Sequence, residues 1–298
     1  MIIKNFIKAA RLRTLPLSIS GIILGGFLAM SDGLFNGVIF SLAILTTIGF
    51  QVISNFANDY GDGVKGTDAI RIGEERMVSS GKISPKQMKK AIMISVILTI
   101  IFALFLIYES FGLSNFGYSL LFFILGIVSV IAAIKYTVGN LAYGYSGFGD
   151  LFVFLFFGLL SVLGSYFLFT KEIYFLLTLP AISIGLLSTA VLNLNNMRDY
   201  QNDKKSKKNT IVVKIGLKAA KRYHYNLLLL SFISAVSYVV LTFTKTVQFI
   251  FLLAYIPLVI HALFVYNNKE ELRLDAELKK VALSTFLFSV LLGLGQVF

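Results

Sequence analysis

Apolar segments close to the length that crosses a bilayer recur along this 298-residue chain. A transmembrane helix needs about 20 mainly apolar residues. Backbone polar groups in lipid must be satisfied within the chain, and an isolated segment can do this only as a helix. The sequence therefore predicts an all-α integral membrane bundle of about nine transmembrane helices, over residues 15–31, 36–58, 91–108, 117–135, 148–169, 174–196, 224–243, 247–266 and 281–298.

Composition agrees with a lipid environment. Hydrophobic residues make up 57% of the chain and charged residues only 14%, and the mean hydropathy is +0.81. A soluble domain has about 25% charged residues. No linker or low-complexity segment divides the chain, so we predict that residues 1–298 form a single membrane-embedded domain. With no cysteine, a metal must be held by oxygen or by His224 and His261, which lack a ligand partner at helical spacing and are predicted to be structural.

The positions of Lys and Arg predict the orientation of the bundle. If the N-terminus and four polar segments lie on one side, only Lys171 and Lys245 of the 27 basic residues lie opposite, counting Lys135 with its adjacent loop. These segments are residues 59–90, 136–147, 197–223 and 267–280. Basic loops stay in the cytoplasm, so we predict a multi-pass cell-membrane protein with a cytoplasmic N-terminus and an external C-terminus. Anionic membrane lipid then explains the net charge of +12, and no nucleic-acid partner is expected.

Asn and Asp side chains cluster at the ends of two apolar segments. The first cluster comprises Asn55, Asn58, Asp59 and Asp62, and the second comprises Asn195, Asn196, Asp199 and Asp203. The helical spacing within each cluster favours one helix face. In both, an Asn precedes an Asp by four residues, as Asn55 precedes Asp59 and Asn195 precedes Asp199. Four predicted spans separate the clusters, which places both at the same membrane face. We therefore predict two four-helix units around a central cavity, plus one further helix.

The residue types in these clusters indicate a magnesium-diphosphate site. Ionisable groups in membrane helices are costly and usually functional. Mg²⁺ prefers oxygen ligands, typically one or two carboxylates together with substrate phosphate oxygens. Basic residues adjoin both clusters and are predicted to contact the diphosphate: Lys65, Arg71, Arg76, Arg198, Lys204, Lys205 and Lys208. Capping and loop topology would explain any one of these residues, but not two matched clusters.

The same motifs resemble the UbiA superfamily of membrane prenyltransferases. The matching stretches are NFANDYGDGVKGTDAIRIGEERMVSSGKIS (55–84) and NLNNMRDYQNDKKSKKNTIVVKIG (193–216). The forms at residues 58–68 and 195–203 look like the MenA branch, the 1,4-dihydroxy-2-naphthoate polyprenyltransferases, and the likeness covers nearly the whole chain. No Arg-Pro follows Lys65-Gly-Thr-Asp68, unlike the 4-hydroxybenzoate branch, and this favours the naphthoate acceptor.

The resemblance implies transfer of a polyprenyl group from an allylic polyprenyl diphosphate to 1,4-dihydroxy-2-naphthoate. Carbon dioxide is lost, and the product serves menaquinone biosynthesis. Two alternatives remain open. One is a related prenyltransferase that acts on 4-hydroxybenzoate or homogentisate. The other is a membrane transporter, which is disfavoured because the charges lie at helix ends and not at the midplane.

The resemblance also implies roles for single residues. Magnesium ligands are predicted to be Asp59, Asp62, Asp199 and Asp203, supported by Asn55, Asn58, Asn195 and Asn196. Lys65 is predicted to act with these aspartates in catalysis. Tyr136, Tyr143 and Asp150 are predicted on the acceptor side, although an interfacial aromatic belt would also explain the two tyrosines.

Overall fold

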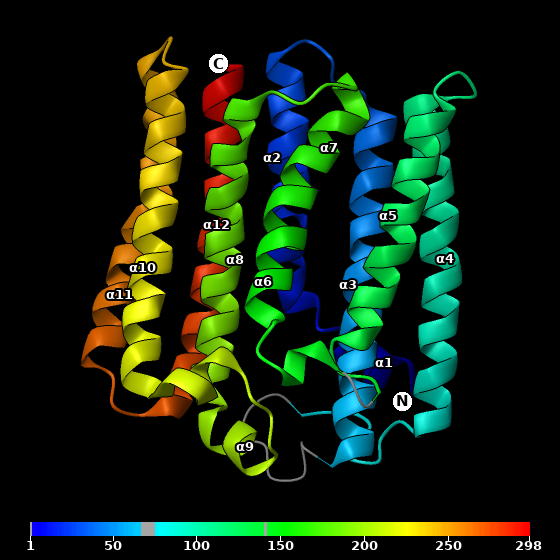
Figure 1. Ribbon diagram of the computed structural model, residues 1–298, viewed down its shortest axis with the longest axis vertical. Coiled ribbons are helices and arrows are strands. Elements are labelled where there is room, and N and C mark those ends of the chain that lie inside the picture. The colour runs from blue at the N-terminus through cyan, green and yellow to red at the C-terminus, as the bar shows by residue number, and fades with distance from the viewer. Residues whose placement is uncertain (1, 67–74, 140–141) are drawn as a thin grey trace.

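The computed structural model describes residues 2–66, 75–139 and 142–298, and in these ranges nine helical segments are long and apolar enough to cross a membrane. This confirms the predicted all-α multi-pass membrane bundle. Figure 1 shows long helices standing side by side, with the two termini at opposite ends. The N-terminal part contains α1 (Ile2–Ala10), η1 (Leu12–Thr14), α2 (Leu15–Ser31), α3 (Gly37–Lys65), α4 (Pro85–Phe111), α5 (Phe116–Lys135) and η2 (Tyr143–Tyr145).

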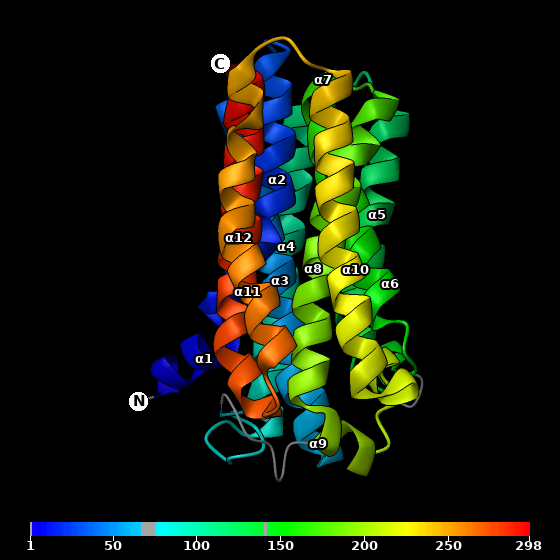
Figure 2. The ribbon, with the colours of Figure 1, turned by 90° about the vertical axis from the view of Figure 1, so that its left-hand side faces the viewer.

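The C-terminal part supplies the second four-helix unit and the last span. Its elements are α6 (Gly149–Val153), η3 (Phe154–Leu160), α7 (Ser161–Thr170), η4 (Phe175–Leu177), α8 (Thr178–Arg198), α9 (Tyr200–Lys205), α10 (Ile211–Leu241), η5 (Thr246–Ala254), α11 (Tyr255–Asn267), η6 (Glu271–Arg273) and α12 (Leu274–Val297). The last helix, α12, packs against α2, α8 and η5 and so joins the two units. We call the end of the bundle that carries α1, α9 and η2 the basic end (Figures 1 and 2).

Several helices extend further into polar sequence than predicted. Helix α3 continues to Lys65 instead of ending near residue 58, and α10 begins at Ile211 instead of residue 224, with a kink at Gly216, whose φ is 77°. Local signals set these limits: Gly66 ends α3 with a left-handed φ of 72°, and the Thr210 side chain accepts from the Val213 amide to cap α10. A hydropathy pattern cannot detect turns that leave the apolar layer. The extension of α3 places Asp59 and Asp62 on a regular helix.

The fifth span contains a π-helical stretch, η3, between α6 and α7. There Gly158 packs on α8 so closely that an added Cβ would lie 2.6 Å from the Gly185 Cα. Small residues permit such approach between membrane helices. The π-helical stretch directs Phe156, Phe157 and Leu160 toward the interior cavity described below.

Candidate active site

A cavity of about 430 Å³ lies inside the bundle, and its walls come from α2, α3, α5, η3, α7 and α8 among others. Its lining divides into two parts. Polar and charged residues of the basic end include Asn58, Asp62, Arg76, Asn195 and Lys208. Apolar residues from the membrane-spanning parts include Phe122, Leu125, Phe156, Phe157, Leu160 and Leu168. The cavity can therefore receive a molecule with a charged head and an apolar body.

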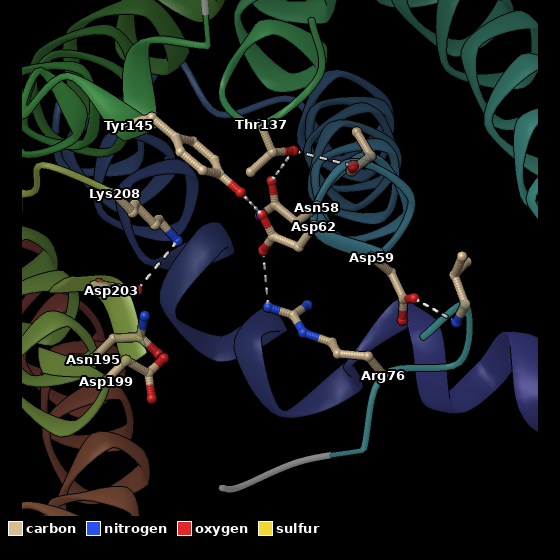
Figure 3. Close-up of polar contacts among 12 residues, drawn as sticks. Asn58, Asp59, Asp62, Arg76, Thr137, Tyr145, Asn195, Asp199, Asp203 and Lys208 are labelled. Atoms are coloured by element: carbon tan, nitrogen blue, oxygen red, sulfur yellow. Dashed lines mark hydrogen bonds and ion pairs between the residues drawn. The ribbon is translucent and has the colours of Figure 1, made fainter. Parts of the chain in front are cut away.

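The first acidic helix end presents Asp62 to this cavity. The Tyr145 hydroxyl donates to Asp62 Oδ1 at 2.6 Å, and Arg76 Nη2 lies 3.6 Å from Oδ2 (Figure 3). One turn earlier, Asn58 Oδ1 accepts from the Thr137 hydroxyl at 3.1 Å. Asn58 and Asp62 thus form an i, i+4 pair of oxygen-bearing side chains facing the cavity, which fits their predicted place at a metal site.

Asp59 and Asn55 have a different use, and neither lines the cavity. Asp59 is 1% exposed, and its two carboxylate oxygens accept from the backbone amides of Met77 and Val78 at 3.0 and 2.8 Å. Figure 3 shows one of these two contacts. The Asn55 amide donates to the Ala10 carbonyl at 2.8 Å. Both residues hold neighbouring chain segments against α3, and this geometry gives no support to their predicted role as metal ligands.

At the second acidic end, Arg198 organises the oxygen ligands. It donates through Nε and Nη2 to the two Asp199 oxygens at 2.7 and 2.8 Å, and through Nη2 to Asn195 Oδ1 at 2.7 Å. Its Nη1 donates to Asp275 of α12 at 2.5 Å, and Asp275 also lies 3.8 Å from Arg13. The Arg198 side chain is only 2% exposed. It is therefore placed to position Asp199 and Asn195, and it is not part of the cavity lining.

The rest of the second end centres on Asp203 and Lys208. Lys208 Nζ lies 4.0 Å from Asp203 Oδ1, and the Lys208 amide donates to the Asp203 carbonyl at 2.8 Å. This short return after α9 brings Lys208 to the cavity wall. Asn196 is buried away from the cavity lining, whereas Lys204 and Lys205 are exposed outside it. Arg71 lies outside the described residues.

Tyr145 and Thr137 are contributors that the sequence analysis missed. The Tyr145 ring has Lys65 Nζ 4.1 Å from its centroid and Lys208 Nζ 5.3 Å from it, and its hydroxyl donates to Asp62. Lys65 Nζ also donates to the Thr137 carbonyl at 2.8 Å. The ring thus lies among the bases of both acidic ends. An aromatic residue in a polar loop at the same membrane face was the available signal.

The predicted acceptor residues are only partly brought together. Tyr136 and Tyr143 both line the cavity, with their ring centroids 5.3 Å apart, and Tyr143 stacks on Phe152 at 4.1 Å. Burial raises the pKa of both phenols, and the nearby carboxylates of Asp150 and Asp62 raise the Tyr136 pKa further. Both tyrosines are therefore neutral hydrogen-bonding groups. Asp150 is buried but is not in the cavity lining.

The donor set is compatible with magnesium. Within the described residues, no three His, Cys, Asp or Glu side chains form one metal-binding group. The carboxylates are instead divided between two sets, Asp62 with Asn58 and Asp199 with Asn195, with Asp203 beyond the second. Magnesium usually takes only one or two protein carboxylates and completes its shell with water and phosphate oxygen. Of these oxygen groups, Asn58, Asp62 and Asn195 line the cavity, while Asp199 and Asp203 lie outside its lining. So sparse a set of protein oxygens fits that preference.

The two histidines lie outside this site but do pair with each other. His224 Nε2 and His261 Nε2 are 2.8 Å apart, and His261 Nδ1 lies 2.6 Å from Glu277 Oε2. All three side chains are buried, on α10, α11 and α12. The predicted structural role is compatible with this chain of contacts, which joins three helices of the bundle. Its partners are on different helices, so spacing within one helix could not reveal them.

A bundle of this kind, with paired acidic helix ends above an apolar cavity, is typical of membrane prenyltransferases. Residues 19–290 match the UbiA prenyltransferase family, and the chain belongs to it. The 1,4-dihydroxy-2-naphthoate octaprenyltransferase of Haemophilus influenzae is 40% identical over 98% of this chain and 96% of its own length. The Escherichia coli protein of the same name is 40% identical over 97% of this chain and 94% of its own.

Solved structures share the fold at low sequence identity. A UbiA homolog from Archaeoglobus fulgidus bound to GPP and Mg²⁺ has a TM-score of 0.69 and 14% identity, covering 98% of this chain and 99% of its own. The apo structure of a UbiA homolog from Aeropyrum pernix K1 has a TM-score of 0.67 and 12% identity, covering 96% and 97%. The fold of the nine spans is thus the UbiA-homolog fold.

Proposed function

We propose that this chain transfers a polyprenyl group from an allylic polyprenyl diphosphate to 1,4-dihydroxy-2-naphthoate, with loss of carbon dioxide, as a step of menaquinone biosynthesis. The cavity carries the proposal, because it joins two acidic helix ends with adjacent bases to an aromatic, apolar interior. The names of the Haemophilus influenzae and Escherichia coli relatives support the acceptor. Family membership argues against a transporter.

Magnesium is the proposed cofactor, and a UbiA homolog of the same fold has been solved with GPP and Mg²⁺. Asp62 with Asn58, and Asp199 with Asn195, would hold it, with Asp203 as a further carboxylate near the second set. When bound, the metal neutralises diphosphate charge that the carboxylates would otherwise repel. Asp59 and Asn55 are left out of this ligand set because backbone groups occupy their polar atoms, and Asn196 because it is buried away from the lining. Asp199 and Asp203 also lie outside the lining, and they are kept because they lie close to the lining residues Asn195 and Lys208.

The bases stabilise the leaving group. The allylic carbon–oxygen bond breaks, and its electron pair leaves with the diphosphate. Arg76 and Lys208 line the polar part of the cavity, where the negative charge grows. Lys65 is not in the lining, and its Nζ lies 4.1 Å from the centroid of the Tyr145 ring. Such charges accelerate the step only as far as they stabilise the transition state more than the substrate. Aromatic walls such as Phe156 keep water from the allylic cation.

The acceptor step then needs no strong protein base. The electron-rich ring supplies the pair for the new carbon–carbon bond, and loss of carbon dioxide returns the pair of the carboxylate bond to the ring. The prenyl group replaces the carboxylate, so no net proton is taken up or released. Tyr136 and Tyr143, as neutral phenols beside the cavity, are proposed to orient the acceptor. Asp150, which is not in the lining, is proposed to affect the acceptor only indirectly, through its charge near Tyr136.

One assay tests this function. Purified protein is incubated with radiolabelled octaprenyl diphosphate and dihydroxynaphthoate, 4-hydroxybenzoate or homogentisate, with and without Mg²⁺. Of the three acceptors, we expect only dihydroxynaphthoate to give a product, a decarboxylated prenyl compound, and only when Mg²⁺ is present. Product only from hydroxybenzoate or homogentisate would contradict the acceptor, and a chelator-resistant reaction would contradict the metal.

We also propose that the basic end faces the cytoplasm, because nearly all basic residues gather there. The chain contains no cysteine, so single cysteines can be labelled without background. In intact cells, a membrane-impermeant maleimide should label Lys245→Cys at the opposite end but spare Lys207→Cys beside α9. The reverse labelling pattern would show that the active site faces outward.

A further inference from the structure

Helix α1 has two apolar surfaces, only one of which contacts the bundle. Its sequence, IIKNFIKAA, alternates apolar and basic residues at helical spacing. Arg11, with a left-handed φ of 49°, separates α1 from η1 and α2. Figure 2 shows α1 projecting sideways from the basic end instead of following the long helices. The first span therefore begins after this bend, and α1 is a separate helix at the membrane boundary.

The inner surface of α1 packs against the segment that leads to Arg76. Phe6 contacts Phe56 of α3, with ring centroids 6.1 Å apart. Ala9, Ala10, Phe56, Met77, Val78, Ile83 and Met88 form one buried cluster with Phe6 against it. The Asn5 amide donates to the Lys82 carbonyl at 3.3 Å. Helix α1 thus supports residues 76–83 from the outside.

The same segment is held from the inside by the acidic helix end. Asp59 accepts from the amides of Met77 and Val78, and the adjacent Arg76 faces Asp62 in the cavity. The position of Arg76 therefore depends on two supports, Asp59 on one side and α1 on the other. Any force that fixes α1 also restricts Arg76.

The outer surface of α1 combines exposed apolar and basic side chains. Ile3 and Ile7, one turn apart, are 76% and 52% exposed. Lys4 and Lys8 are also one turn apart and exposed. A lone exposed isoleucine is unremarkable, but two on one face of a boundary helix with lysines beside them match a helix lying in the lipid headgroup region.

The surroundings of α1 indicate lipid as the occupant. Met88 of α4 belongs to the cluster that α1 covers, and the next turns of α4 expose Met93, Ile94 and Ile97 as lipid-facing surface. Helix α1 thus packs at the start of a membrane span whose exposed surface is apolar. Lys4 and Lys8 lie among the many bases of this end, which favours negatively charged headgroups.

We propose that α1 is an interfacial helix that binds anionic lipid headgroups and, through its inner surface, holds the Arg76 segment in its working position. Ile3 and Ile7 insert at the headgroup boundary, and Lys4 and Lys8 contact the lipid phosphates. Docking of α1 on anionic lipid then stabilises the arrangement in which Arg76 faces Asp62.

Immersion depth tests the docking without any substrate, so it stands apart from the proposed reaction. Single cysteines replace Ile3, Lys4, Ile7 or Lys8 in the cysteine-free chain and carry a spin label in vesicles of phosphatidylcholine and phosphatidylglycerol. We expect labels at positions 3 and 7 to be accessible to oxygen and protected from an aqueous nickel chelate, and labels at positions 4 and 8 to show the reverse. Equal nickel access at all four positions would overturn the proposal. Protection of 3 and 7 from both quenchers would also overturn it, in favour of a protein partner or second copy.

Prenyl transfer in vesicles tests the coupling to Arg76. Adding phosphatidylglycerol to phosphatidylcholine vesicles should raise the prenyl-transfer rate of the wild-type protein. In the double variant Lys4→Gln, Lys8→Gln, this increase should be about fivefold smaller. The control is Lys89→Gln with Lys90→Gln, which removes two exposed charges from α4 at the same end and should leave the stimulation unchanged. Stimulation that survives loss of Lys4 and Lys8, or falls equally in the control, would overturn the coupling.

Discussion

The two acidic helix ends carry similar residues but use them differently. On α3, Asp62 faces the cavity beside Arg76 and Tyr145, while Asp59, three residues earlier, accepts from two backbone amides. Directly after α8, Asp199 accepts two hydrogen bonds from its neighbour Arg198, which also donates to Asp275 of α12. The first end is thus completed by loops, and the second by another helix.

This difference changes how the two ends correspond. The sequence spacing pairs Asn55 and Asp59 with Asn195 and Asp199, an offset of 140 residues. The cavity instead receives Asn58 and Asp62 beside Asn195, which corresponds to an offset of 137 residues. Both registers keep an Asn four residues before an Asp. Side-chain spacing alone allowed either register. Asp59 packs against residues 77–78, which leaves Asn58 and Asp62 to face the cavity and selects the offset of 137 residues.

Removal of magnesium should have the largest effect and act on both ends at once. Chelation should abolish prenyl transfer, because without the metal the carboxylates of both ends repel the diphosphate. Activity at increasing Mg²⁺ measures the recovery, which should be complete for unmodified protein. Full activity in the chelator would show that the bases alone hold the diphosphate.

Replacement of Asp62 should be more damaging to catalysis than replacement of Asp59. We expect Asp62→Asn to lower kcat by about 10²–10³-fold, as when a charged group at the transition state is lost. Asp59→Asn should mainly destabilise the protein by about 1–3 kcal/mol, because a buried backbone amide loses its acceptor. Steady-state kinetics and thermal unfolding in detergent separate the two effects. If Asp59→Asn lowered kcat as much as Asp62→Asn did and left stability unchanged, Asp59 would have to be counted as a metal ligand.

Asp275→Asn should weaken the second end through Arg198. Loss of this charge releases a buried guanidinium, and we expect about a tenfold lower kcat/KM together with a weaker apparent Mg²⁺ affinity. Asp275→Glu should recover much of both. The control is Glu270→Gln on the same segment, which loses only an exposed pair with Arg273 at 2.8 Å and should be silent. An unchanged Mg²⁺ response in Asp275→Asn would limit Asp275 to a structural role.

The smallest effect should come from Tyr145→Phe. This change removes the hydroxyl that donates to Asp62 but keeps the ring near Lys65 and Lys208. The expected loss is about 1 kcal/mol, or about fivefold in kcat/KM. Tyr145→Leu, which also removes the ring, should lose more. If the two variants behave alike, the ring has no separate part in placing the bases.

The membrane spans and the two polar ends could be predicted from sequence because they depend on patterns within single helices. Nine apolar stretches and helically spaced Asn and Asp residues are local features. The choice between Asp59 and Asp62 was not local, since it depended on where residues 77–78 fold back onto α3. The pairing of His224 with His261 joins two helices, and the place of Tyr145 depended on the short helix η2 between two spans. Contacts between distant segments decided all three.

The division of the cavity into charged and apolar parts has a consequence for turnover. A prenyl diphosphate is an amphiphile, and the cavity lining has the same division into a charged part and an apolar part. The proposed product carries neither the diphosphate nor the carboxylate. It therefore has no negative charge to interact with the arginine and lysine side chains of the lining. The bilayer is then the more favourable environment for the product. The reaction thus converts a charged amphiphile that the cavity binds into an apolar molecule that partitions into lipid.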